Sequence, residues 1–182
     1  MVEEISVVVD PTPAPNPGNR RISLIGHSGA GKTDCLLQLG ADRQLAEMDS
    51  ALGVTQSPSF LTALQWLVET TASEPVVVVS CHEEMLKAMQ RAKSAGELRE
   101  YFSRLYFVYL WKQKDRLTRH LEKTHAGSSQ YRDTSSKRYT LAAYERFHQM
   151  FLLIADYTID VRGKSAVEVA AEVRALSKSV GE

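Results

Sequence analysis

The sequence predicts an α/β domain in which a parallel β-sheet is covered by helices. From Arg21 onward, short apolar runs alternate with longer segments whose apolar residues repeat at helical spacing, as strands joined by crossover helices do. The run Val76–Val79 is wholly β-branched, which favours a strand buried on both faces in the middle of the sheet. A glycine-rich segment, 26–33, lies between the first apolar run and the first helical segment.

The composition is that of one globular domain. The chain has 182 residues, 43% of them hydrophobic, and its 22 basic and 22 acidic residues cancel, which excludes a fibrous or disordered protein. A formal net charge of zero disfavours general attraction to nucleic acid or to an anionic membrane. The two cysteines, Cys35 and Cys81, are too few for a disulfide framework. No apolar run is long enough to span a bilayer, and we expect a cytoplasmic location.

Residues 1–20 are predicted to form a tail outside the folded domain, which then comprises residues 21–182. Four prolines alternate with other residues between Pro11 and Pro17, so this segment should be an extended linker. The preceding run, Ile5–Val9, is either a short strand or a loosely held tail. As a strand it could extend a sheet edge in this chain or in a neighbouring subunit, which would give a homo-oligomer.

The first half of the domain is predicted to contain three strands and two helices. One helix should begin at Lys32 and end at Gly40. Another should begin at the pair Ser57-Pro58, because proline is favoured in the first turn of a helix. The strands are expected at 21–25, 45–48 and 76–79, of which the second has the weakest pattern.

The second half is predicted to add two strands, further helices and a mobile lid. The lid, residues 125–137, is polar and has almost nothing to bury. The last helix should begin at a capping box formed by Ser165 and Glu168. The strands are expected at 105–110 and 157–161, and the other helices at 82–93, at 115–124 and around an apolar face of Tyr144, Phe147, Phe151 and Ile154.

Residues Gly26 to Thr33 match G-x-x-x-x-G-K-[ST], the pattern of a phosphate-binding loop between a strand and a helix. The glycines let backbone N–H groups turn toward phosphate oxygens, and the start of the helix adds a favourable dipole. Lys32 should reach the terminal phosphates of ATP, and Thr33 should hold Mg²⁺. Cys35, one turn into the helix, should also belong to the core. The residues predicted to bind the nucleotide are Gly26, Ser28, Gly29, Ala30, Gly31, Lys32, Thr33 and Cys35.

An acidic pair, Glu47 and Asp49, follows the weak second strand. Motor and switch proteins place a carboxylate after a later strand to support Mg²⁺ and the attacking water, but the predicted strands 76–79 and 105–110 end without one. A transferase is therefore favoured over a hydrolytic motor. In a small-molecule kinase, one carboxylate of such a pair joins the metal shell and the other orients and deprotonates an acceptor hydroxyl. The alternative is that the pair belongs to an ordinary solvated loop.

Three segments, 24–33, 45–52 and 138–160, resemble the shikimate kinase branch of the P-loop kinases. The resemblance implies a three-layer P-loop NTPase fold with a five-stranded parallel sheet in the order 2-3-1-4-5 and a mobile lid. It implies that Glu47 supports Mg²⁺ and that Asp49 contacts the acceptor hydroxyls.

The resemblance also implies roles for three arginines. Arg132 would be the lid arginine that closes on the phosphates, Arg119 would lie near the adenine, and Arg146 would bind the substrate. An arginine in a mobile loop stabilises transition-state charge only when the loop closes and excludes water. The whole segment 111–146 holds nine Lys or Arg against four Asp or Glu, so it should attract phosphates; alternatively, most of these residues form a solvated basic face.

The residues around the acceptor depart from the family pattern. The segment Ser80-Cys81-His82 replaces the glycine-rich substrate turn, and residues 53–63 contain no basic residue. Because a carboxylate ligand normally needs cations for bidentate pairing, the sequence predicts an acceptor other than shikimate. His82 follows the strand at 76–79, at the carboxyl edge where open α/β sheets bind ligands, and could face the acceptor.

The sequence therefore predicts an enzyme that moves the γ-phosphoryl group of ATP, with Mg²⁺, to a hydroxyl of a small molecule. Lys32, Asp49 and Arg132 are its predicted catalytic residues, and Thr33 and Glu47 its predicted metal ligands. Two alternatives stay open. One is a kinase for a nucleoside or nucleic-acid hydroxyl, which the net charge disfavours and the local basic excess permits. The other is a non-catalytic regulatory module that binds a nucleotide.

Overall fold

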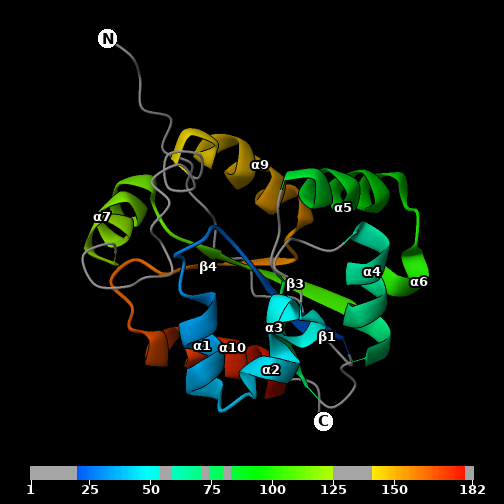
Figure 1. The fold of residues 1–182 in the computed structure, drawn as a ribbon, viewed down its shortest axis with the longest axis horizontal. Coiled ribbons are helices and arrows are strands. Elements are labelled where there is room, and N and C mark those ends of the chain that lie inside the picture. Colours follow the sequence, from blue (N-terminus) through cyan, green and yellow to red (C-terminus); the bar gives the residue numbers. More distant parts are fainter. Residues whose placement is uncertain (1–19, 54–58, 71–73, 80–82, 125–140, 179–182) are drawn as a thin grey trace.

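The computed structural model describes residues 20–53, 59–70, 74–79, 83–124 and 141–178 (Figure 1). The predicted N-terminal tail, up to residue 19, and the predicted lid, 125–137, lie outside these ranges. In the part of the chain that is described, no helix is long and apolar enough to cross a membrane.

The described residues form one sheet of four parallel strands in the order β2-β1-β3-β4. Ile22 in β1 lies opposite both Val76 in β2 and Tyr106 in β3, and Val108 in β3 lies opposite Tyr157 in β4. The strands are β1 (Arg21–Ile25), β2 (Val76–Val78), β3 (Leu105–Trp111) and β4 (Tyr157–Asp160).

The expected five-stranded sheet with the order 2-3-1-4-5 is wrong, because the predicted second strand, 45–48, is not a strand. Asp42 accepts a hydrogen bond from the N–H of Gln44 and caps a short helix, which favours a helical turn over an extended chain. Only Glu47 bridges to the sheet, at Val78. The strand β2, expected in the middle of the sheet, therefore lies at its edge. Its valines are buried because helices cover both faces of the sheet.

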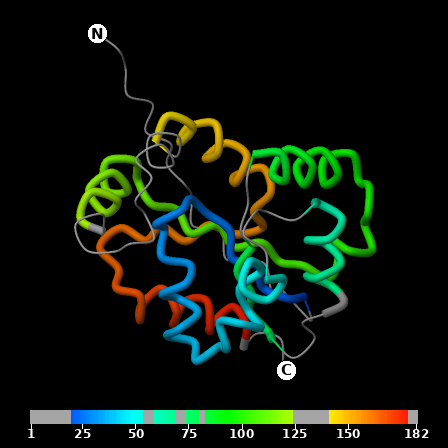
Figure 2. Tube along the Cα trace, viewed as in Figure 1, coloured from blue at the N-terminus to red at the C-terminus, as the bar shows by residue number. Residues whose placement is uncertain are grey.

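Helices cover the sheet on both faces, so the domain has three layers (Figures 1 and 2). On one face α1 packs against α10, and on the other α5 packs against α9. The α/β architecture expected from the sequence is therefore confirmed. The helices are α1 (Lys32–Leu39), α2 (Arg43–Ala46), α3 (Met48–Leu52), α4 (Phe60–Gln65), α5 (Glu83–Ala95), α6 (Arg99–Phe102), α7 (Lys114–Thr124), α9 (Tyr144–Ile154) and α10 (Ala166–Lys178), with a π-helical turn at Trp66–Thr70.

The strands send alternate side chains into two apolar cores, one on each face of the sheet. Leu24 and Val108 belong to the core that α1 and α10 cover, whereas Ile25 and Tyr109 belong to the core under α5 and α9. All four side chains are fully buried. Because the strands are fixed on both faces, the loops at their carboxyl ends start from rigid positions.

The helix boundaries follow local sequence signals closely. The first helix, α1, begins at Lys32 and ends before Gly40, as predicted. The capping box at the start of α10 is confirmed, since the N–H of Ser165 donates to Oε2 of Glu168 and the N–H of Glu168 donates to Oγ of Ser165. The helix α4 begins after Ser59, its N-cap, whereas the predicted start signal at 57–58 lies outside the described residues.

Candidate active site

The turn after β1 has the backbone geometry of an anion-binding loop. Gly26, Gly29 and Gly31 have φ angles of 150°, 81° and 96°, which side chains rarely tolerate. A Cβ atom at Gly26 would lie 2.8 Å from the carbonyl oxygen of Leu110 in β3. The backbone of β3 therefore leaves no room for a side chain at this position. Gly31 is the N-cap of α1, whose first-turn N–H groups open toward this loop.

Two lysines lie against the loop. Nζ of Lys32 donates to the carbonyl oxygens of Gly26 at 2.7 Å and of His27 at 3.0 Å. Nζ of Lys112, which follows β3, donates to the carbonyl oxygen of Gly29 at 3.1 Å. Burial lowers the pKa of Lys112, although Asp34 opposes the shift. The loop thus carries two cations, one of them partly desolvated, at the place where a phosphate chain would lie.

Thr33 and Glu47 come from different elements and are in direct contact. Oγ1 of Thr33 donates to Oε1 of Glu47 at 2.9 Å. Arg43 and Ser50 donate to the other oxygen of the same carboxylate. Partial burial opposes ionisation of Glu47, but the hydrogen bonds from these three side chains outweigh it and hold its pKa below the ordinary value. Glu47 is therefore a fixed anion beside the last residue of the loop motif.

Asp49 lies two residues after Glu47, in the first turn of α3. Its Oδ1 atom is buried and has no hydrogen-bond partner among the described residues. A buried carboxylate oxygen without a donor destabilises the fold, and such atoms are rare unless a ligand uses them. The predicted acidic pair is thus an anchored carboxylate followed by one whose buried oxygen has no donor among the described residues, unlike a pair in an ordinary solvated loop.

The oxygen atoms of Thr33 and Glu47 suit Mg²⁺, which prefers hard oxygen ligands and is usually held by one or two carboxylates together with substrate phosphates. In the part of the chain that is described, no three His, Cys, Asp or Glu side chains gather into a metal site. One hydroxyl and one carboxylate fit a magnesium ion whose other ligands are substrate phosphates and water.

The other predicted nucleotide-binding residues lie on or beside the loop. Ser28 is exposed, Ala30 is buried, and Cys35 is fully buried in the core under α1, where burial raises the pKa of its thiol to about 11. The core position of Cys35 is confirmed, and its N–H donates to the carbonyl oxygen of Gly31 at 2.9 Å. A role of Cys35 in nucleotide binding stays a prediction.

The predicted basic site residues divide into three groups. Arg119 is exposed on α7 and pairs with Asp115 at 2.9 Å. Arg146 on α9 pairs with Glu83 at the start of α5, also at 2.9 Å. Arg132 and His82 lie outside the described residues.

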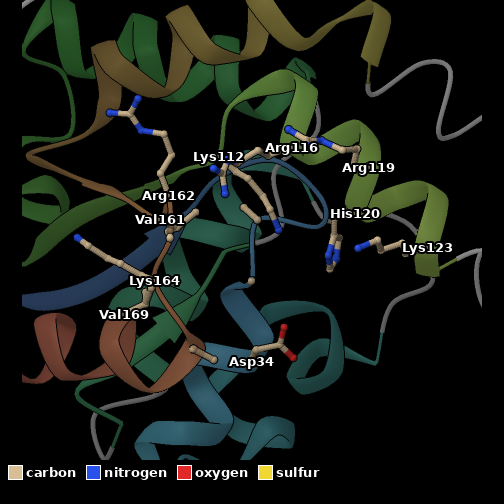
Figure 3. A pocket seen from close by; sticks show the side chains of 14 residues that line it. Asp34, Lys112, Arg116, Arg119, His120, Lys123, Val161, Arg162, Lys164 and Val169 are labelled. Atoms are coloured by element: carbon tan, nitrogen blue, oxygen red, sulfur yellow. The ribbon is translucent and has the colours of Figure 1, made fainter.

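A cavity of about 410 Å³ opens beside the glycine-rich loop. Figure 3 shows that its side chains come from α7, from Lys112 just before it, from the segment after β4, from α10 and from the start of α1. Arg119 lies in its wall, so the structure places this arginine beside a space next to the loop. The lining residues are Ala30, Gly31, Asp34, Lys112, Arg116, Arg119, His120, Lys123, Val161, Arg162, Gly163, Lys164, Ala166 and Val169.

His27, the second residue of the loop motif, lies in an aromatic cluster that sequence analysis missed. It is 3% exposed, stacks on Tyr144 at 4.3 Å between ring centroids and meets Phe151 edge-on at 5.2 Å. Its Nε2 atom is 3.2 Å from the carbonyl oxygen of Tyr144. The hydroxyl of Tyr109 lies 3.4 Å from Nδ1 of His27 and 2.9 Å from Nδ1 of His148. These contacts join the loop to α9. The sequence signal for this cluster was the presence of a histidine at a variable position of the loop motif.

The same cluster extends to Lys112, the residue after β3 whose side chain contacts the loop. The indole N–H of Trp111 donates to the hydroxyl of Tyr144 at 3.1 Å, and this hydroxyl donates to the carbonyl oxygen of Lys112 at 2.7 Å. The backbone of Lys112 is therefore held by α9 while its ammonium group holds Gly29.

The burial of His27 predicts that acid destabilises the protein. Burial is the largest cause that lowers its pKa, to about 4; nearby Lys32 and His148 add to the effect, and the Tyr144 carbonyl opposes it. Because the unfolded histidine keeps its ordinary pKa, only the unfolded state gains the proton as the pH falls from 6.5 toward 4. The histidine should then remove about 3 kcal/mol from the free energy of unfolding over that range, with no effect above it.

Urea unfolding of the natural protein and of His27→Gln at pH 7, 5 and 4 measures this effect. Contributions of carboxylates cancel in the comparison, so the variant should lose less stability on acidification. Parallel losses in the two proteins would show that His27 does not titrate as a buried base.

No protein-family model matches the chain, and no curated protein matches it. Among solved structures, the chain is similar to shikimate kinase from Acinetobacter baumannii in complex with shikimate. The two chains are 17% identical, the match covers 88% of this chain and 93% of the other, and the TM-score is 0.49. At this identity and TM-score the likeness assigns no role to any residue.

Proposed function

We propose that this protein is an ATP- and Mg²⁺-dependent phosphotransferase that moves the γ-phosphoryl group to a hydroxyl of a small molecule. The observation that carries the proposal is the hydrogen bond from Thr33 to Glu47, at 2.9 Å. Two residues further along the chain, the Oδ1 atom of Asp49 has no hydrogen-bond partner among the described residues. The hydrogen bond joins the end of a phosphate-binding loop to an acidic pair, and phosphoryl transfer needs these two parts together.

In this proposal the loop N–H groups and Lys32 bind the phosphates, because both can offer donors to phosphate oxygens. Thr33 and Glu47 would hold Mg²⁺, which when bound neutralises charge on the phosphates. Asp49 would accept a hydrogen bond from the acceptor hydroxyl and take its proton as the hydroxyl oxygen bonds to the γ-phosphorus, while the bond from that phosphorus to the bridging oxygen breaks and ADP leaves. Arg132 would add positive charge from the lid.

The acceptor in this proposal lacks a carboxylate. Arg146, the arginine expected to bind an anionic substrate, is paired with Glu83 at 2.9 Å. Lys87 pairs with Glu83 at 3.0 Å and with Glu84 at 3.2 Å, so these two carboxylates together offset the charges of Arg146 and Lys87. Asp49 adds a negative charge of its own to the same carboxyl edge of the sheet, where Glu47 bridges to the end of β2. A neutral hydroxylated compound fits this balance better than a hydroxy acid.

Replacing Glu83 by Gln should therefore improve binding of an anionic acceptor. Without its carboxylate, Arg146 is released to pair with a ligand, which is worth about tenfold in affinity for a charged hydrogen bond. Shikimate and its uncharged methyl ester form a matched pair of probes, and calorimetry with the nucleotide complex measures both. The ratio of shikimate to ester affinity should rise about tenfold in Glu83→Gln.

The neighbouring substitution Glu84→Gln is the matched control, because Glu84 is exposed and pairs only with Lys87 at 3.2 Å among the described residues. It should leave the ratio where it is. If the natural protein already binds shikimate more tightly than the ester, the proposal that the acceptor lacks a carboxylate is wrong.

A two-step binding experiment tests the function itself. Calorimetric titration with ATP and Mg²⁺ comes first, and a thermal-shift screen of hydroxylated metabolites on the nucleotide complex follows. A compound that binds only the native state raises the melting temperature by mass action, so a hit identifies an acceptor to be tested for transfer. If ATP does not bind, the proposal fails. If ATP binds and no hydroxylated compound accepts phosphate, the chain is a nucleotide-binding module and not a kinase.

A further inference from the structure

The helix α7 packs directly on the phosphate-binding loop. A Cβ atom built at Gly29 would lie 3.2 Å from side-chain atoms of His120 and Leu117 and 3.3 Å from Leu121. The segment that leads into α7 is held to the same glycine by Lys112. Whatever the loop binds therefore lies beside the face of α7 that these contacts define.

The adjoining face of α7, which shares His120 with these contacts, is basic along its length. Arg116, Arg119, His120 and Lys123 recur at spacings of three and four residues, so they share one side of the helix, and all four line the cavity beside the loop (Figure 3). From Arg116 to Lys123 this basic face extends about 10 Å at the usual helical rise. Among the described residues that line the cavity, Asp34 is the single carboxylate.

Two of these cations lack an ion-pair partner in the part of the chain that the structure describes. Arg119 pairs with Asp115, and across the cavity Arg162 and Lys164 pair with Asp160 and Glu172. By contrast, Arg116 and Lys123 form no ion pair with any described residue, and each faces the cavity wall from α7. Positive charge that has no partner among the described residues favours binding of an anionic ligand.

The adenosine part of a nucleotide carries no negative charge that could pair with Arg116 and Lys123. In the proposed function, the loop N–H groups and Lys32 hold the phosphate chain, while the cavity next to Gly31 receives the base and ribose. Base and ribose are uncharged, so an ordinary nucleotide leaves Arg116 and Lys123 without a counterion. Burial lowers the pKa of His120, and nearby Lys112 adds to this effect, whereas Asp34 opposes it.

We propose that the nucleotide bound here carries a further phosphate on its ribose, and that Arg116 and Lys123 of α7 bind it. The inference rests on the proposed function, since it takes the loop to be a nucleotide site. The ligand would then be an adenine nucleotide with an additional phosphate on its ribose, a chemical class distinct from ATP.

Calorimetry with ADP and with its 2′- and 3′-phosphorylated derivatives tests this inference at one fixed salt concentration. One of the two derivatives should bind about tenfold or more tightly than ADP, as a pair of charged hydrogen bonds to phosphate provides. In the double variant Arg116→Gln with Lys123→Gln, the ratio of derivative to ADP affinity should fall to near one.

The control is the double variant Lys114→Gln with Arg104→Gln, which removes the same charge. Lys114 lies on α7 outside the cavity lining, and Arg104 lies at the other end of β3. The affinity ratio of this control should match that of the natural protein. An equal loss in both double variants would show a general effect of net charge and would overturn the inference.

Lys32→Ala separates the failure of this inference from the failure of the proposed function. If ADP does not bind, or binds equally well to Lys32→Ala, the loop is not the nucleotide site and both fail. If ADP binding depends on Lys32 and neither derivative binds more tightly, only the inference of a ribose phosphate fails. If an oligonucleotide with a 5′-diphosphate binds more tightly than either derivative, the inference is overturned, because the ligand is then the end of a nucleic acid and not a mononucleotide.

Discussion

Replacing Lys32 by Ala is expected to lower phosphoryl transfer by about 10³-fold or more, the largest effect of any single substitution in this chain. The ammonium group of Lys32 lies against the carbonyl oxygens of Gly26 and His27, at the centre of the loop, and would stabilise the charge that builds on the transferred phosphoryl group. Release of ADP from Mg²⁺-ATP, with the screened acceptor and with water alone, measures the loss.

The fold should survive this substitution, because Lys32 is partly exposed and its ammonium group donates to carbonyl oxygens of the loop. Circular dichroism and the melting temperature check this point. Arg104→Ala serves as the control, since Arg104 is an exposed cation whose nearest carboxylate, on Glu100, is 3.9 Å away. Near-normal turnover in Lys32→Ala would remove the phosphotransferase assignment.

Replacing Asp49 by Asn is expected to lower acceptor-dependent transfer by about 10²- to 10⁴-fold, the usual contribution of a positioned general base. The amide has the same shape as the carboxylate but cannot take a proton from a hydroxyl. Binding of ATP should change little, because Glu47 and Thr33 remain in contact without Asp49. Steady-state kinetics with the acceptor and calorimetry with ATP measure the two quantities separately.

The stability of Asp49→Asn distinguishes a functional carboxylate from a structural one. Since Oδ1 of Asp49 is buried without a donor among the described residues, removing its charge should not lower the melting temperature. If the variant loses activity and keeps or gains stability, Asp49 is a functional carboxylate whose burial lowers the stability of the fold. A variant that loses activity and stability together would indicate that Asp49 holds the structure of α3.

The local signals in the sequence were sufficient for most elements. The glycine pattern at 26–33 placed the turn between β1 and α1, Gly40 marked the end of α1, and the pair Ser165 and Glu168 marked the start of α10. These signals work because caps and tight turns depend on residues within a few positions of each other. For the same reason, the sequence alone could name Lys32 and Thr33 as candidates for phosphate and metal.

The segment 42–53 shows where local patterns fail. Its apolar residues suggested a strand, but the cap at Asp42 and the turn at Gly53 make two short helices, and only the bridge of Glu47 to Val78 remains of the expected pairing. Loss of that strand leaves β2 at the edge of the sheet. Pairing of strands depends on partners far apart in sequence, so periodicity within one segment cannot decide it.

The sequence by itself determined a glycine-rich loop between a strand and a helix, followed by an acidic pair. Only the tertiary structure decided the partners of these residues: Thr33 for Glu47, Glu83 for Arg146, and Tyr144 for the buried His27. It also placed the basic face of α7 beside the loop. The physical reason is that the charge and desolvation of a side chain depend on neighbours that the fold brings from distant parts of the chain, whereas a motif records only neighbours along it.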